Sequence, residues 1–229
     1  MQLSIILPAL NEAARVEAAL ARLAAQAPGA ERILVDGGST DGTPLLARRL
    51  GGPGLTVLEG ERGRARQMNR GAAAARGDWL LFLHVDTRLP NGFAAEPGRA
   101  AARGCGAGAF RLRIAGRHPL LPLLAWGANL RTAWRGIALG DQALFLRRGV
   151  FQALGGFPDL PLMEDYALAL RLRAAGERLY LSPLAAETSG RRWDGAGFWR
   201  TWWTMRRAYW GFDRGAPVAA LAARYPDVR

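Results

Sequence analysis

The first ninety residues alternate between short apolar runs and stretches whose apolar residues follow helical spacing. Between the first two runs, for example, Val16, Leu20 and Leu23 recur on one face of a helix. The apolar runs are Leu3–Leu7, Ile33–Val35, Leu55–Leu58 and a longer one that begins at Trp79. Strands that alternate with helices at this spacing predict βαβ units joined by right-handed crossovers. The predicted fold class is therefore α/β, with a mostly parallel central sheet flanked by helices.

Local signals place the first helices. Asn11 is positioned to cap the first one, and Asp41 or Thr43 the second, which carries Pro44 in its first turn. A third helix is expected from about Gly63 to Ala75, leading into the Trp79 run.

The pattern changes after Pro90. We expect a half-exposed strand, a second strand, a helix that ends before Gly176 and a late strand. These elements are, in order, Ala109–Ile114, Ala143–Leu146, Met163–Ala175 and Leu179–Leu181. From residue 195 to residue 214 the chain is rich in Trp, Tyr and Arg at helix-compatible spacing. Because no linker-like stretch interrupts the chain, a single domain over residues 1–229 with a C-terminal helical tail is predicted.

The formal net charge is +12, and every basic side chain except the two histidines is an arginine. Arginine suits phosphate recognition, so a nucleotide, nucleic acid or anionic lipid is a plausible partner, although a codon bias explains the same composition. A nucleic-acid-binding module would gather its arginines on one face with stacking aromatics, and here they are scattered. The single cysteine, the absence of a signal peptide and the absence of a long apolar run predict a cytoplasmic protein, soluble or peripheral at a membrane.

Polar side chains follow three of the predicted strands. Residues 8–12 follow the first and residues 36–41 the second, while His84 and Asp86 end the Trp79 run. Ligands of open α/β sheets bind beyond the carboxyl ends of the strands, so these segments are expected to meet in one crevice. Alternation along a strand would put His84 and Asp86 on one face, able to hold a divalent ion. A turn aspartate and a packed histidine are the structural alternative.

Several side chains near these strand ends suit a nucleotide. Gly37 and Gly38 would let a ligand approach the backbone, and Asp36 and Glu12 can accept hydrogen bonds from a base or ribose. Arginines 62, 64 and 66 lie upstream of the Trp79 run, where they can meet phosphates. An ordinary turn followed by a helix cap is the alternative for residues 36–42.

Three ordered motifs resemble those of family 2 glycosyltransferases. They are residues 4–12 (SIILPALNE), 35–43 (VDGGSTDGT) and 83–86 (LHVD), and the resemblance extends in order over roughly residues 1–213. It implies the nucleotide-sugar-binding GT-A fold and transfer with inversion at the anomeric carbon. The His-x-Asp sequence is most similar to a subgroup associated with radical-SAM and selenodomain proteins. Residues 1–90 would then bind the nucleotide sugar, residues 91–194 would hold the acceptor and catalytic groups, and residues 195–229 would form the tail.

The resemblance implies a role for each matching donor-site residue. Asp86 corresponds to the last acid of the family's metal-binding Asp-x-Asp motif, and His84 replaces the first acid. Mn²⁺ or Mg²⁺ is the implied cofactor, and imidazole suits Mn²⁺ better. The base and ribose of the nucleotide sugar would contact Pro8, Ala9, Asn11, Glu12 and Asp36, and the ribose or diphosphate would lie near Arg66 and Asn69.

On the acceptor side, Asp165 matches the family's general base, which removes the proton of the acceptor hydroxyl. Glu164 precedes it, with favourable placement at a helix start as its alternative explanation. Asp141 and Gln142 would line the acceptor side or form a turn before a strand. Five residues are implied on this side or beside the leaving group: Glu164, Asp141, Gln142 and the late pair Arg192–Trp193.

The aromatic tail either packs onto the domain, which we favour because aromatic side chains mostly serve cores, or lies in a membrane interface near a lipid-linked acceptor.

Two other functions are alternatives to glycosyl transfer. A nucleotidyltransferase would carry a Gly-rich basic signature after its first strand, which residues 8–12 lack. A sugar-nucleotide-binding protein without turnover would not need Asp165.

Overall fold

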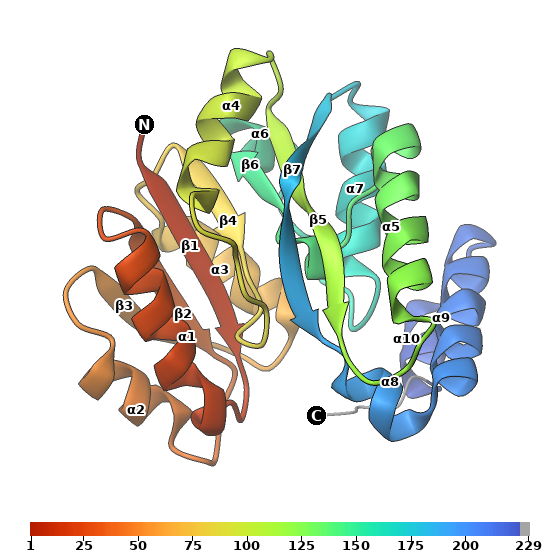
Figure 1. The fold of residues 1–229 in the computed structure, drawn as a ribbon, viewed down its shortest axis with the longest axis horizontal. Coiled ribbons are helices and arrows are strands. Elements are labelled where there is room, and N and C mark those ends of the chain that lie inside the picture. The colour runs from red at the N-terminus through yellow and green to blue at the C-terminus, as the bar shows by residue number, and fades with distance from the viewer. Residues whose placement is uncertain (225–229) are drawn as a thin grey trace.

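A seven-stranded sheet in the order β3-β2-β1-β4-β6-β5-β7 runs through the computed structural model, which describes residues 1–224 (Figure 1). Strand β6 is antiparallel to both of its neighbours, and every other pair is parallel. The strands are β1 (Leu3–Ala9), β2 (Glu31–Asp36), β3 (Leu55–Glu59), β4 (Trp79–Phe82), β5 (Ala107–Ala115), β6 (Phe145–Arg147) and β7 (Leu179–Ser189). The prediction of a mostly parallel α/β sheet is confirmed.

Helices cover both faces of this sheet (Figure 1). They are α1 (Ala13–Gln26), α2 (Thr43–Leu50), α3 (Arg64–Ala74), α4 (Glu96–Ala102), α5 (Leu121–Arg135), α6 (Arg148–Ala153), α7 (Glu164–Ala174), α8 (Arg191–Ala196), α9 (Phe198–Asp213) and α10 (Val218–Ala223). Two 3₁₀ turns, Phe93–Ala95 and Gly140–Gln142, complete the described elements. Helix α5 packs against β5, and α8 to α10 lie beyond it at the end of the sheet opposite β3.

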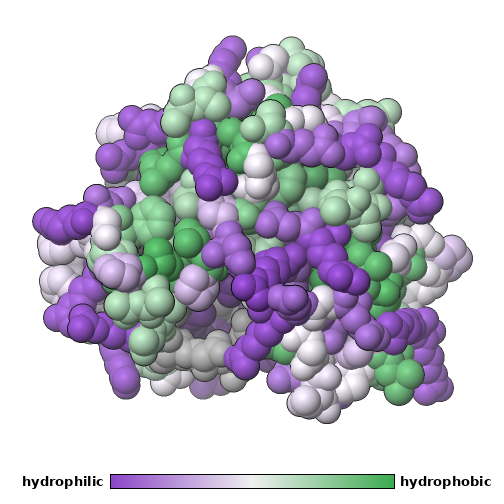
Figure 2. All heavy atoms as spheres, turned by 180° about the vertical axis from the view of Figure 1, so that it is seen from behind, coloured by the Kyte–Doolittle hydropathy of each residue, from purple (hydrophilic) through white to green (hydrophobic). Residues whose placement is uncertain are grey.

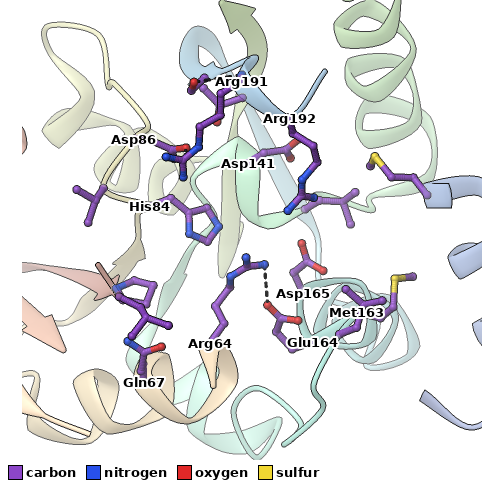
Figure 3. Close-up of a pocket in the computed structure, with 18 of the residues that line it drawn as sticks. Arg64, Gln67, His84, Asp86, Asp141, Met163, Glu164, Asp165, Arg191 and Arg192 are labelled. Atoms are coloured by element: carbon purple, nitrogen blue, oxygen red, sulfur yellow. Dashed lines mark hydrogen bonds and ion pairs between the residues drawn. The ribbon is translucent and has the colours of Figure 1, made fainter. Parts of the chain in front are cut away.

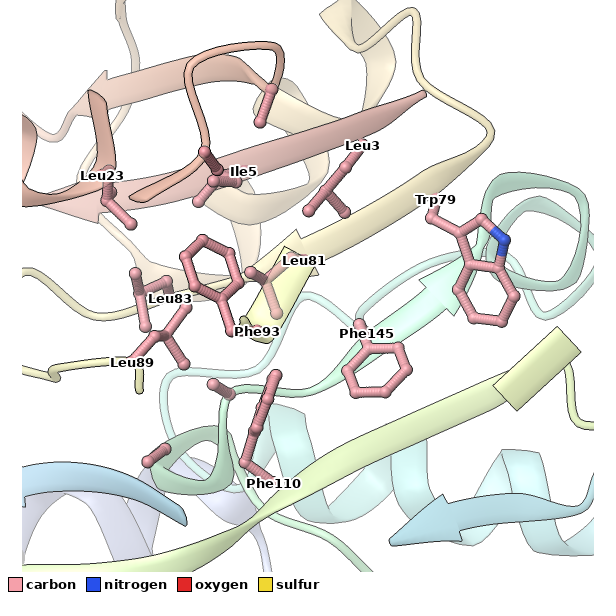
Figure 4. Packing of buried hydrophobic residues seen from close by; sticks show 14 of the residues in the cluster. Leu3, Ile5, Leu23, Trp79, Leu81, Leu83, Leu89, Phe93, Phe110 and Phe145 are labelled. Atoms are coloured by element: carbon pink, nitrogen blue, oxygen red, sulfur yellow. The ribbon is translucent and has the colours of Figure 1, made fainter. Parts of the chain in front are cut away.

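The alternation of side chains along the strands divides the core into two layers. In β1, Ile5 faces the layer of α1 and α4, whereas Ile6 faces the layer of α3, α6 and α7. The first layer is centred on Phe93, Phe110 and Phe145, all fully buried, with ring centroids of the last two 5.5 Å apart (Figure 4). The central strands β1 and β4 are thereby packed on both faces.

The loops after β1 and β2 are tied to each other. The backbone N–H of Asn11 donates to the hydroxyl of Ser39 at 2.8 Å, and the Asn11 amide oxygen accepts from the N–H of Thr40 at 2.9 Å. The Asp41 carboxylate accepts from Ala13 N–H, the first of α1, at 2.9 Å. Asn11 therefore does not cap α1 as predicted. Its backbone is left-handed (φ 54°) and its side chain serves the neighbouring loop.

Strand β4 is shorter than predicted. It ends at Phe82, and the N–H of Thr87 bonds to the carbonyl of His84 at 3.0 Å, closing a turn. After this turn, Arg88 forms a backbone bridge with Glu187 of β7. His84 and Asp86 therefore lie on a turn, and strand alternation does not orient them.

The aromatic tail predicted over residues 195–229 corresponds mainly to α9; residues 225–229 lie outside the described part of the chain. Phe198 packs with Leu121 and Trp193, as the packing interpretation requires. Trp199, Trp203 and Trp210 are more than half exposed, so packing accounts for only part of this helix. Helix α5 lies in an apolar, proline-containing stretch for which the sequence pattern predicts no helix.

Candidate active site

A pocket of about 250 Å³ opens beyond the carboxyl ends of β1 and β4 (Figure 3). This is the edge at which open α/β sheets bind ligands. The amino ends of α7 and α8 form its other wall. Most of the predicted site residues line it: Pro8, Ala9, Glu12, His84, Asp86, Asp141, Glu164, Asp165, Arg192 and Trp193.

Arg191 joins two of the acidic residues in this pocket. Its Nη2 lies 3.2 Å from Oε1 of Glu12 and 3.3 Å from Oδ2 of Asp86. The guanidinium thus connects the end of β1 with the turn after β4, and it balances two carboxylates that would otherwise repel each other. The sequence motif favoured Arg192 for a charge-neutralising role, and the structure adds Arg191 beside it.

Asp165 is held at the start of α7. Its Oδ2 accepts a hydrogen bond from the N–H of Gly140 at 2.8 Å, and its Oδ1 accepts from the N–H of Tyr166 at 2.7 Å. Met163, just before the helix, has left-handed backbone geometry (φ 68°), which is costly for a residue with a side chain. This turn directs the first residues of α7 into the pocket (Figure 3).

Gly140 stands between His84 and Asp165. A Cβ atom at this position would lie 3.0 Å from Nε2 of His84 and 3.3 Å from Oδ2 of Asp165. The first distance is shorter than nearly all real Cβ contacts, so a larger residue would displace the imidazole. Because Gly140 has no side chain, His84 and Asp165 can both lie close to its backbone.

Two further carboxyls of the pocket have raised pKa values. Burial raises the pKa of Asp141 from 3.8 to about 6; Arg131 opposes this shift and Asp165 adds to it. Its Oδ1 is buried and accepts no hydrogen bond from the described residues. Burial also raises the pKa of Glu164, against the attraction of Arg64, whose Nη1 lies 3.2 Å from Oε1 of Glu164. The acceptor side of the pocket therefore holds carboxyls that ionise less readily than usual.

Two predicted phosphate or ribose contacts lie outside the pocket lining. The Arg66 guanidinium bonds to Asp159 at 2.9 Å and to Glu61 at 2.7 Å on the exposed surface. The Asn69 amide donates to the carbonyl of Phe157 and accepts from its N–H, at 2.8 and 2.9 Å. Both ends of this amide attach α3 to the loop before α7, so Asn69 has a structural contact at this position.

Three other predicted residues are also absent from the pocket lining. Gln142 is buried and accepts from the hydroxyl of Thr132 at 2.8 Å, so it shapes the turn that carries Asp141. Asn11 binds the second loop as described above. Asp36 uses Oδ2 to accept from the N–H groups of Gly38 and Ser39, while its buried Oδ1 has no hydrogen-bond partner among the described residues.

Sequence reasoning missed Gln67. Its buried Nε2 donates to the carbonyls of Ala9 and Val35, both at 2.8 Å, and so joins the ends of β1 and β2. A Cβ at Gly37 would lie 2.9 Å from this amide, which gives that glycine a packing role. An isolated polar residue on the buried face of α3 was the only signal available.

Possible ligands of a divalent ion are also found in this site. Within residues 1–224 no group of three or more His, Cys, Asp or Glu side chains is arranged to hold a metal. His84 and Asp86 line the pocket together, and an imidazole and a carboxylate are suitable donors for Mn²⁺. The residues fit an ion that completes its coordination with oxygens of a bound ligand.

Residues 4–97 match the family model for glycosyl transferase family 2. A PGL/p-HBAD biosynthesis glycosyltransferase of Mycobacterium tuberculosis (strain ATCC 25618 / H37Rv) is 34% identical over 172 residues, which cover 67% of this chain and 62% of that protein. The chain belongs to glycosyl transferase family 2. The succinoglycan biosynthesis protein ExoA of Rhizobium meliloti is 28% identical over 197 residues, covering 78% of this chain and 60% of ExoA. This family 2 chain therefore spans about three fifths of the length of these curated relatives.

Solved structures share the family 2 fold. The mannosyltransferase PcManGT from Pyrobaculum calidifontis, in complex with GDP-Man and Mn²⁺, superposes with a TM-score of 0.71 at 26% identity, over 90% of this chain and 61% of that one. S. aureus TarS superposes with a TM-score of 0.65 at 18% identity, over 85% of this chain and 38% of TarS. The expected GT-A architecture is thus confirmed, and the TarS likeness concerns the fold alone.

Proposed function

We propose that the protein transfers a sugar from a nucleotide-diphosphate sugar to an acceptor hydroxyl, with inversion and with the help of a divalent ion. The observation that carries the proposal is the convergence of Glu12, the His84–Asp86 turn and Asp165 on one pocket at the carboxyl edge of the sheet. Family membership supports it, as does the likeness to a mannosyltransferase in complex with GDP-Man and Mn²⁺.

In this proposal Asp165 is the general base. Its carboxylate removes the proton of the acceptor hydroxyl while that oxygen attacks the anomeric carbon and the bond to the diphosphate breaks on the opposite side. Two backbone N–H groups fix the orientation of the carboxylate, as proximity catalysis requires. Asp141 and Glu164 lie beside it, and Trp193 forms a wall of the acceptor side.

The donor would occupy the side of the pocket formed by β1 and the turn after β4. His84 and Asp86 would hold the ion, which when bound stabilises the negative charge of the departing diphosphate. Arg64 and Arg192 line the same pocket and supply positive charge toward the leaving group. Pro8, Ala9, Glu12 and Asp36 remain the proposed contacts of base and ribose.

We also propose that residues 1–229 act as one unit at the cytoplasmic face of a membrane, with α9 as the contact. None of the helices within residues 1–224 is long and apolar enough to cross a bilayer. Indole rings beside arginines on α9 have the composition of an interfacial helix.

Calorimetry with UDP-, GDP- and TDP-sugars, each with Mn²⁺ or Mg²⁺, tests donor binding. We expect at least one donor to bind in a metal-dependent manner, and no binding by any of them would count against the proposal. Asp165→Asn should abolish transfer and retain donor binding, because the amide oxygen still accepts from Gly140. Asp159→Asn, at an exposed acid outside the pocket, is the matched control and should remain active.

A further inference from the structure

Exposed large apolar side chains are concentrated on α5 and α9. Trp199, Trp203 and Trp210 of α9 are separated by four and seven residues, which places them on one helix face. The side chains are Leu123, Trp126 and Trp134 on α5 and Trp199, Trp203 and Trp210 on α9, with exposures from 52% to 81%. In the rest of the described chain only Met1, Leu45 and Leu50 belong to this class. Apolar residues gathered in this way mark an interaction surface.

A groove of about 780 Å³ separates the two helices. Leu123 and Trp126 line one side, and Trp199 and Trp202 line the other. A volume of this size accommodates a drug-sized apolar ligand or a hydrocarbon chain. We call this feature the α5–α9 groove.

The α5–α9 groove adjoins the candidate active site. Trp193, Met205 and Tyr209 line both the groove and the pocket that contains Asp165. Trp193 packs on Phe198 with ring centroids 5.3 Å apart, which places α9 against the pocket wall. A ligand in the groove therefore lies next to the pocket that contains Asp165.

Arginines border the apolar surface. Arg131, Arg135 and Arg206 line the α5–α9 groove, and the Arg206 guanidinium lies 5.6 Å from the ring centre of Trp202. Arg214 lies over Trp210 at 5.5 Å. On the side of the molecule seen in Figure 2, strongly hydrophilic residues lie among hydrophobic ones over much of the surface. Indoles beside cations suit the headgroup region of an anionic bilayer.

We propose that the α5–α9 groove holds the hydrocarbon chain of a lipid acceptor, presented by an anionic bilayer, with the acceptor hydroxyl directed toward Asp165. The groove supplies the apolar binding site, and the three residues that it shares with the pocket place it beside the site of transfer. The surrounding arginines and tryptophans supply the contact with the bilayer. This inference rests on the proposed transfer reaction and names the class of acceptor.

Tryptophan quenching tests the inference with two probes. The first is phosphatidylglycerol vesicles with brominated acyl chains, compared with phosphatidylcholine vesicles carrying the same chains. The second is dodecyl maltoside brominated in its alkyl chain, used below its micellar concentration so that a single chain binds. Both the phosphatidylglycerol vesicles and the monomeric chain should quench the protein, and phosphatidylcholine should quench less.

The double variant Leu123→Glu/Trp199→Glu places charge on both walls of the groove. It should weaken both interactions at least about tenfold, because burying either side chain is worth more than one decade of affinity. Leu45→Glu, at a position 70% exposed on α2, is the matched control and should behave as wild type. The altered residues are exposed, and donor binding by calorimetry verifies that the variants are folded.

Three outcomes would overturn the inference. Vesicle quenching without quenching by the monomeric chain would mean surface contact without a chain in the groove. Equal quenching of the double variant and the control would place the interaction elsewhere, and lipid-free dimerisation through this face would make a second copy its occupant. If the wild-type protein bound no donor in calorimetry, the proposed function would be refuted instead. This outcome can be told apart from the others because the quenching assays need no donor.

Discussion

Replacing Asp141 with asparagine should change how the stability of the protein depends on pH. The unfolded carboxyl ionises near its ordinary pKa of 3.8, whereas in the folded protein burial raises this pKa to about 6. Between these values the unfolded state has released its proton and the folded state has retained it. The free energy of unfolding therefore falls as the pH rises from about 4 to about 6, and stays lowered above that range.

The displacement from 3.8 to about 6 corresponds to a cost of about 3 kcal/mol at pH 7. An uncharged amide of the same shape escapes this cost. We expect Asp141→Asn and wild type to differ by a nearly constant amount below pH 4, and the difference to shift in favour of the variant by about 3 kcal/mol by pH 7.

Urea unfolding at intervals from pH 4 to pH 8 measures this difference, and the change with pH is the diagnostic quantity because it cancels any constant effect of the amide. Parallel curves for the two proteins would refute the reasoning and show that Asp141 ionises normally in the folded state. Asp159→Asn, at an exposed carboxyl, provides the control for a general change in net charge.

Three further predictions concern residues of the site and its supports. Asn69→Ala should lower the free energy of unfolding by about 1–3 kcal/mol, since it leaves the buried backbone groups of Phe157 unpaired. Unchanged stability in urea titrations would contradict this structural role and favour a role in donor binding. Arg191→Met should raise the Mn²⁺ affinity of the donor-free protein by removing a cation from Asp86, and weaker binding in a calorimetric titration would contradict this. Gly140→Ala should reduce transfer on the order of tenfold by displacing His84, with little loss in melting temperature; full activity would show that the imidazole position is unimportant.

The alternating half of the fold was predictable because its signals are local. Each of the first four strands was recognised as an apolar run, and Gly176, with a positive φ of 71°, ends α7 as expected. The boundaries of β4 were not predictable, since the chain leaves the strand to pair Arg88 with Glu187, a hundred residues later. Such a pairing has no signature within the apolar run itself.

The candidate site was likewise predictable from the sequence only in part. Residues at strand ends and at the start of α7 could be placed because topology brings these positions together. The different fates of Arg64, which enters the pocket, and Arg66, which binds Asp159 outside it, could not be predicted. Side chains two positions apart on a helix point in different directions. The packed position of α3 determines which of the two arginines faces the pocket.

The hydrogen bonds between the loops after β1 and β2 have a consequence for protein engineering. Asn11 binds Ser39 and Thr40, and Asp41 binds the first N–H of α1, so the two loops form one mechanical unit. Exchanging either loop alone for that of another transferase would sever these bonds, each worth about 0.5–1.5 kcal/mol. Attempts to graft a new nucleotide preference should therefore move both loops together as a cassette, and random libraries should yield improved variants as paired changes.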